Sequence, residues 1–275
     1  MRLSKKISGS MIIMIPIAII WVIPLVWMIV LALTPNELVQ QNTIRLLPVQ
    51  TTLANLWSVF QKGLTLRWLT NSIIVTGVTT ILVVLSQSMA AYALARIPFR
   101  GRSIVYPLFI AGLMVPREAM FIPLFLMFAR LDGHNTYTAL ILPRVAIPLG
   151  VFLVTQFMYA IPKEIEEAVQ IDGANRWTAF WKIIMPMSLP ALTALALFTF
   201  IQTWNDYLWP LVSANRREMF TITTGLASLQ GNFAQAMELG SLMARGLIAA
   251  LPLLILFFLF QKHLIRGISM TSGGK

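Results

Sequence analysis

Residues 68–95 read WLTNSIIVTGVTTILVVLSQSMAAYALA, and no charged side chain interrupts this stretch between Arg67 and Arg96. A helix needs about 20 mostly apolar residues to cross the hydrocarbon core of a bilayer. The stretch is long enough for this, and the basic residue at each end can remain in the headgroup region. We therefore predict a membrane-spanning helix over residues 72–95.

Five further stretches are comparably apolar, and together they account for most of the chain. The predicted spans are 11–33, 72–95, 104–128, 140–158, 189–211 and 241–260. The first span is longer than the apolar core of a signal peptide and no small-residue cleavage site follows it, so we interpret it as a retained anchor. The predicted fold class is an all-α integral membrane protein with six transmembrane helices in a single domain, residues 1–275.

The third stretch, 104–128, carries Pro107, Pro116 and Pro123. Proline removes a backbone hydrogen bond from a helix. Irregular backbone at membrane depth is tolerated only where protein or a water-filled cavity satisfies the freed groups. We predict a kinked or broken helix here, placed inside the helix bundle.

The composition agrees with a membrane protein and excludes several other classes. Hydrophobic residues make up 57% of the chain and charged residues 11%, whereas soluble domains carry about 25% charged residues. The net charge of +11 is therefore attributed to basic loops facing anionic lipid rather than to nucleic acid. The chain has no Cys and two distant His, which excludes disulfides and a Cys nucleophile and argues against a metal site.

Six spans place both ends of the chain on the same side of the membrane. If that side is the cytoplasm, the inner segments hold about twice as many Lys and Arg residues as the outer segments, as the positive-inside rule requires. The short loop Arg96–Arg102, which contains three Arg, is the clearest marker. We predict that both termini are cytoplasmic.

The predicted inner loop between the fourth and fifth spans, residues 162–186, reads PKEIEEAVQIDGANRWTAFWKIIMP. Pro162 and the acidic residues after it are typical of a helix start, and Gly173 suits a tight turn. A second short helix is predicted over 176–184, ending before Pro186. Such an amphipathic hairpin either lies in the lipid headgroups or docks on a soluble partner, and these physical arguments leave both open.

Particular residues of this loop resemble the EAA loop of permease subunits of ABC importers. They are Glu167-Ala168-Val169, Gly173 and Ile183-x-Met185-Pro186. The spacing matches throughout, and only Val169 and Met185 depart, conservatively, from the family pattern. Further stretches are similar to carbohydrate-type permeases, such as the maltose-transporter G-type subunit and its glycerol-phosphate relatives: Leu53-x-Asn55, Asn71-Ser72, Ala91–Arg96, Pro123-Leu124 and Trp204–Pro210.

The resemblance implies a permease subunit, in the cell inner membrane, of an ATP-driven importer for a sugar or related solute. It implies that the hairpin is a coupling element docked on an ATP-hydrolysing subunit, with Glu167 paired to a basic residue there. The implied docking residues are Glu167, Ala168, Val169, Asp172, Gly173, Ile183, Met185 and Pro186.

The implied partners are a second permease chain, two ATP-binding subunits and an external solute-binding protein, with membrane lipid around them. This chain lacks the G-x-x-x-x-G-K-[ST] phosphate loop. It is therefore not expected to be an enzyme or to hold a cofactor, and ATP and Mg are expected in the partner ATPase subunits.

Charged and polar residues at membrane depth are candidates for the solute path. They are Arg117, Glu118, Asn205, Asp206 and Tyr207. Two structural alternatives remain open: Asp206 could satisfy a hydrogen bond near the outer interface, and Arg117 could pair locally with Glu118. Arg144 is expected to contact headgroups at the outer end of the fourth span.

Three other functions compete with this interpretation. The same kind of importer could carry a polyamine, an anion or a peptide. A self-contained secondary transporter commonly shows two related halves, and no internal repeat is visible. An intramembrane enzyme needs paired catalytic groups, and neither His-E-x-x-His nor Gly-x-Ser-x-Gly is present.

Overall fold

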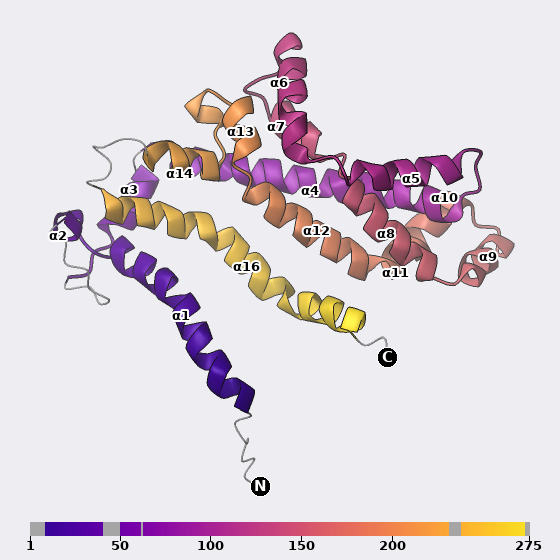
Figure 1. Ribbon diagram of the computed structural model, residues 1–275, viewed down its shortest axis with the longest axis horizontal. Coiled ribbons are helices and arrows are strands. Elements are labelled where there is room, and N and C mark those ends of the chain that lie inside the picture. The colour runs from indigo at the N-terminus through magenta and orange to yellow at the C-terminus, as the bar shows by residue number, and fades with distance from the viewer. Residues whose placement is uncertain (1–8, 41–49, 62, 231–237, 273–275) are drawn as a thin grey trace, which may run out of the picture. The chain divides into compact units, whose positions relative to one another are not determined.

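The computed structural model describes residues 9–40, 50–61, 63–230 and 238–272, and these residues form helices joined by turns, with no strand among them (Figure 1). The chain divides into two compact units, with boundaries after Leu66, Thr224 and Pro252. The first unit contains the N-terminal segment and residues 225–252, and the second contains 67–224 and the C-terminal segment. The predicted single domain over 1–275 stays a prediction.

The first unit contains α1 (Gly9–Ala32), α2 (Asn36–Gln40), α3 (Ala54–Gln61) and the beginning of α16 (Leu239–Ser272). A network of asparagine side chains joins these elements. Asn55 donates to the carbonyl oxygens of Ala32 at 3.1 Å and Thr34 at 2.7 Å, and Asn36 donates to Asn55 Oδ1 at 3.1 Å. The carbonyls that α1 leaves unpaired at its end are thereby satisfied from α3.

The second unit is built around α4, which runs from Thr65 to Arg96. The other α-helices of this unit are α5 (Arg102–Gly112), α6 (Phe121–Arg130), α7 (Tyr137–Ile141), α8 (Pro148–Ala160), α9 (Lys163–Ile171), α10 (Arg176–Ala179), α11 (Met185–Met187), α12 (Leu189–Trp204), α13 (Leu208–Ser213), the first part of α14 (Ile222–Gln230) and the part of α16 that follows Pro252. Helix α8 packs against both α5 and α12, and α13 packs against α6 and α7.

Helix α4 begins seven residues before the predicted start at residue 72. The added turns are anchored to the segment before α14. The Trp68 indole donates to the Arg217 carbonyl at 2.7 Å, and the buried Asn71 amide donates to the carbonyls of Glu218 and Phe220. Because these polar side chains have hydrogen-bond partners within the protein, the helix can include them and begins before the apolar stretch.

Three described helical stretches are long and apolar enough to cross a bilayer: Ile13–Ala32, Thr65–Arg96 and Leu239–Gln261. The other three predicted spans correspond to helix pairs bent by more than 40°, which gives up to six crossings if each pair is one span. The membrane-spanning, all-helical fold class is confirmed, while the six-span count and the cytoplasmic termini stay predictions.

The prediction of a break in the third span is confirmed. Helix α5 and the segment Arg117–Arg130 meet at 98°, and the chain leaves the helix just before Pro116. Within this chain α5 has no buried residue and α6 buries only Phe128, so the interior position predicted for this span stays a prediction. Apolar composition alone does not distinguish a lipid-facing or partner-facing surface from an intramolecular one.

The fifth predicted span, 189–211, does not form one helix. Helix α12 ends at Trp204, and the chain turns at Asn205-Asp206 before α13 begins at Leu208. The helix ends at the polar residues Asn205 and Asp206, because both form other bonds: the Asn205 side chain donates to the Ile201 carbonyl at 3.0 Å, and the Asp206 carbonyl accepts from Thr223 Oγ1 at 2.8 Å. The break places Asp206 at a helix end.

Candidate functional site

The predicted hairpin at 162–186 is present. Helix α9 begins after Pro162, with Glu164 and Glu166 in its first turn. Gly173 has φ +85°, donates to the Gln170 carbonyl at 3.0 Å, and is followed by Ala174, which donates to the Val169 carbonyl at 3.2 Å. This is the Schellman pattern of a helix C-terminus, in which the left-handed residue is most often glycine. The turn predicted at Gly173 is confirmed.

The second arm of the hairpin is longer than predicted. Asn175 caps it by accepting a hydrogen bond from the Thr178 N–H at 2.8 Å. A π-helical turn over Phe180–Ile184 leads into α11, so the helix continues past Pro186 to Met187 and then bends by 75° into α12. Pro186 has no N–H to donate to the preceding turn, and the π-helical turn stands directly before Met185 and Pro186, where the regular α-helical bonding is already interrupted.

The predicted docking residues divide into two groups by exposure. Those exposed on the hairpin are Glu167, Ala168, Asp172, Gly173 and Pro186, and those half-buried are Val169, Ile183 and Met185. Met185 packs against the core of this chain, with Phe180 and Ile184, which leaves less of its side chain for a partner. Two residues outside the predicted set, Ile171 at 85% and Trp177 at 61% exposed, add apolar surface on either side of the Gly173 turn.

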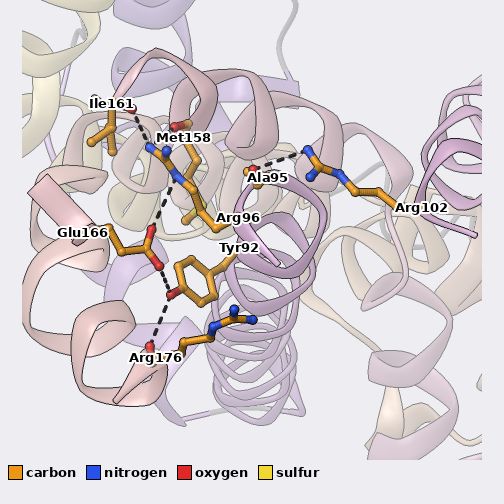
Figure 2. A network of polar contacts seen from close by, with 8 residues as sticks. All are labelled: Tyr92, Ala95, Arg96, Arg102, Met158, Ile161, Glu166 and Arg176. Carbon is orange, nitrogen blue, oxygen red and sulfur yellow. Dashed lines mark hydrogen bonds and ion pairs between the residues drawn. The ribbon is translucent and has the colours of Figure 1, made fainter. Parts of the chain in front are cut away.

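A polar network holds the base of the hairpin (Figure 2). The buried Glu166 carboxylate accepts a hydrogen bond from the Tyr92 hydroxyl, which also lies 3.3 Å from the Arg176 carbonyl oxygen on the second arm. Arg96 Nε lies 3.8 Å from Glu166 Oε2. The Arg96 guanidinium also donates to the carbonyls of Met158 at 2.7 Å and Ile161 at 2.5 Å, at the end of α8.

The five residues predicted for the solute path lie together around one cavity of about 300 Å³. It is lined by Arg117, Glu118, Phe121, Arg144, Gln202, Asn205, Asp206, Tyr207 and Leu208. Arg117 and Glu118 follow the break at Pro116, while Asn205–Tyr207 form the break after α12. Two helix interruptions therefore gather these polar side chains, whose role as solute contacts stays a prediction.

A buried ion pair joins two walls of this cavity. The Arg144 guanidinium contacts the Asp206 carboxylate, and their side chains are 5% and 13% exposed. The predicted headgroup contact of Arg144 is wrong: the bend between α7 and α8 at residues 142–147 turns this side chain into the protein. A buried charge is stable when it is paired, and Asp206 supplies the partner.

Arg117 and Glu118 behave differently from this pair. Both are exposed, and within the described ranges no ion pair joins them to each other. The local pairing considered for them is therefore not found.

A second, mostly apolar cavity of about 550 Å³ shares Arg117, Phe121 and Arg144 with the first and extends along Phe128 and Trp209.

Sequence reasoning did not select Tyr92, Arg96 or Glu166 as site residues. Tyr92 and Arg96 are four positions apart and so lie on one face of α4, within the Ala91–Arg96 stretch that resembles the carbohydrate-type permeases. This spacing is the signal that could have singled them out.

Along the parts of the chain that are described, no three His, Asp or Glu side chains gather closely enough to hold a metal ion.

Comparisons with known proteins agree with these features. The sequence is 37% identical over 261 residues to the arabinooligosaccharides transport system permease protein AraQ of Halalkalibacterium halodurans, covering 94% of this chain and 92% of that protein. It is 35% identical over 258 residues to the trehalose/maltose transport system permease protein MalG of Thermococcus litoralis, covering 92% and 91%.

The fold is also shared with a solved structure. A chain of the bacterial ABC transporter involved in the import of the acidic polysaccharide alginate matches with a TM-score of 0.85 and 22% identity, over 95% of this chain and 98% of that chain. Residues 87–270, which include the hairpin and both interrupted segments around Asp206 and Arg144, match the family model. The chain therefore belongs to the family of binding-protein-dependent transport system inner membrane components, which are multi-pass transport proteins and not enzymes.

Proposed function

We propose that this chain is the permease subunit of an ATP-driven importer for a sugar or oligosaccharide. The similarity to AraQ and MalG along more than nine-tenths of the chain carries the proposal, because both relatives are named for carbohydrate transport. The cavity that holds Asp206, Asn205 and Tyr207 supports it, since hydroxyl-rich solutes need hydrogen-bonding groups beside an aromatic ring. This chain supplies the solute path together with a second permease chain.

The hairpin is the docking element for an ATP-binding subunit. Its exposed residues combine a carboxylate at Glu167 with apolar surface at Ala168 and Ile171, which suits a partner cleft that has a basic residue at its edge. Two such subunits bind ATP and Mg and close on each other, and an external binding protein delivers the solute. ATP hydrolysis takes place in those subunits, and this chain holds no cofactor.

The solute path runs along the cavity between the two interrupted segments. Arg117, Glu118 and Asn205 are exposed and free to exchange water for solute hydroxyls, while Tyr207, 38% exposed, offers its ring for stacking. Arg144 and Asp206 form the wall of the path, where their mutual pairing leaves a polar surface without an uncompensated charge.

A transport panel tests this function. The chain is co-purified in mild detergent with its partners and reconstituted in proteoliposomes, and uptake of arabinotriose, trehalose, maltose, putrescine and a tripeptide is measured with and without ATP. We expect uptake of at least one sugar that requires both ATP and the binding protein. Uptake of putrescine or the peptide alone would assign a different solute class, and uptake without ATP would contradict the importer itself.

The turn at Gly173 gives a separate prediction. A Cβ added there would meet nothing within 4 Å in this chain, but φ is +85°. A left-handed conformation costs most non-glycine residues about 1–2 kcal/mol, and asparagine tolerates it better than a β-branched residue. We expect Gly173→Val to speed proteolytic cleavage of the hairpin and lower uptake, and Gly173→Asn to stay near wild type. Equal loss of uptake in both variants would contradict a conformational cause.

A further inference from the structure

We propose that Tyr92, Arg96 and Glu166 are positioning residues that fix the base of the hairpin to α4, so that the hairpin and α4 move as one body when the ATP-binding subunits close. The inference rests on the proposed docking function of the hairpin. It differs from that function because none of the three residues belongs to the exposed docking surface.

The first support is the number of elements that this network joins. Tyr92 and Arg96 come from the last turns of α4, Glu166 from the first turn of α9, and Arg176 contributes its carbonyl from the beginning of the second arm (Figure 2). One hydroxyl group therefore lies within hydrogen-bond reach of both arms. A hairpin held at both arms cannot pivot about one of them without breaking a contact at the other.

The second support is the burial of the contacts. The side chains of Arg96 and Glu166 are 3% and 10% exposed, and Tyr92 is 5% exposed. Water competes poorly for buried polar groups, so opening the network would leave a carboxylate and a guanidinium without their partners. The Tyr92 ring also packs on Phe180, with 5.0 Å between ring centres. This contact joins the hairpin to α4 through apolar surface as well.

The third support is that α4 also contacts the wall of the cavity, nearer its N-terminus than the network. Gln87, five residues before Tyr92 on the same helix, donates to the Val145 carbonyl at 2.8 Å. Val145 follows Arg144, whose guanidinium forms the ion pair at the cavity. Hairpin and cavity wall are therefore both attached to one helix, and a displacement of the hairpin base displaces α4 beside the cavity.

The test measures whether the hairpin and α4 keep a fixed distance. Because the chain has no native Cys, spin labels at Gln170→Cys and Met89→Cys, both exposed positions, report on the hairpin and α4 without further changes to this chain. Pulsed electron paramagnetic resonance is recorded on the assembled complex, nucleotide-free and trapped with ATP and vanadate. We expect the same distance distribution in both states, and a broadened or shifted one for Glu166→Ala.

Coupling is measured on the same complexes in proteoliposomes. We expect Glu166→Ala to lower the trehalose or arabinotriose taken up per ATP hydrolysed by about tenfold, as for the loss of a hydrogen bond to a charged group. Tyr92→Phe, which keeps the packed ring, is expected to show a smaller loss. Combining it with Glu166→Ala is expected to add less than Tyr92→Phe costs alone, because the Tyr92–Glu166 bond is already absent and only the contact with the Arg176 carbonyl is left to lose. Glu166→Gln recovers part of the ratio, since an amide oxygen still accepts from Tyr92, and Glu164→Gln is the matched exposed control.

The outcomes separate this inference from the docking function. A distance between the two labels that changes between the states in the otherwise unaltered chain overturns the inference. So does an unchanged uptake per ATP in the assembled Tyr92→Phe complex, even where Glu166→Ala does not assemble. Failure of the docking function has a different signature: the unaltered chain then retains no ATP-binding subunit during purification.

Discussion

Replacing Glu167 by lysine is expected to abolish solute uptake while the protein still inserts in the membrane. The change reverses a charge on the exposed face of α9, where the proposed function places a basic residue of the ATP-binding subunit. Loss of one partner from a desolvated charge pair costs about 3 kcal/mol or more, and about 100-fold in affinity. Uptake in proteoliposomes and retention of the ATP-binding subunits during purification measure both consequences.

The matched control for this charge reversal is Glu164→Lys. Glu164 lies in the same helix, is exposed, and belongs to the first turn, so the substitution makes the same change in net charge away from the proposed docking residues. We expect this variant to keep its partners and its uptake. A hairpin that lay in the lipid headgroups would be attracted more strongly to anionic lipid by Glu167→Lys, and uptake would not fall. Unchanged uptake in the Glu167→Lys variant would therefore contradict docking.

Replacing Asp206 by alanine is expected to have the largest effect on stability. The substitution leaves the Arg144 guanidinium, 5% exposed, without its carboxylate partner. Removing one member of a buried ion pair costs about 3–5 kcal/mol. We expect the variant complex to lose its monodisperse elution at a lower temperature than wild type and to import no solute.

A double variant separates stability from transport at this ion pair. In Arg144→Met with Asp206→Leu no charge is left unpaired, and such apolar replacements are often neutral or stabilising. We expect its thermal stability to return to about the wild-type level while uptake stays absent, because the polar wall of the cavity is gone. Recovery of uptake in the double variant would show that the pair serves the fold alone.

The long apolar stretches could be assigned from the sequence because each depends on local composition. Thr65–Arg96 and Leu239–Gln261 contain the predicted spans 72–95 and 241–260. The limits of the interrupted spans could not be assigned in this way. The predicted span 189–211 contains a break at Asn205-Asp206 that depends on partners such as Thr223, which lies 17 positions farther along the chain.

In the candidate site, too, the features set by local sequence were predictable and those set by distant contacts were not. The Gly173 turn was predictable, because only local backbone conformation decides it, and its φ of +85° confirms it. The headgroup contact expected for Arg144 rests on its place just after Pro143, at the outer end of the fourth predicted span. Its actual partner, Asp206, lies in the turn between α12 and α13, and no local pattern connects the two.

By itself, the sequence determined that the chain is a membrane protein, that a hairpin with a glycine turn lies between its fourth and fifth predicted spans, and to which family it belongs. Hydrophobicity, charge and turn chemistry are local properties and need no knowledge of contacts. Only the tertiary structure decided that Glu166 and not its neighbour faces inward, and that its carboxylate meets Tyr92, 74 positions away. Burial of a charge depends on which helices surround it, and that is settled only when distant segments pack together.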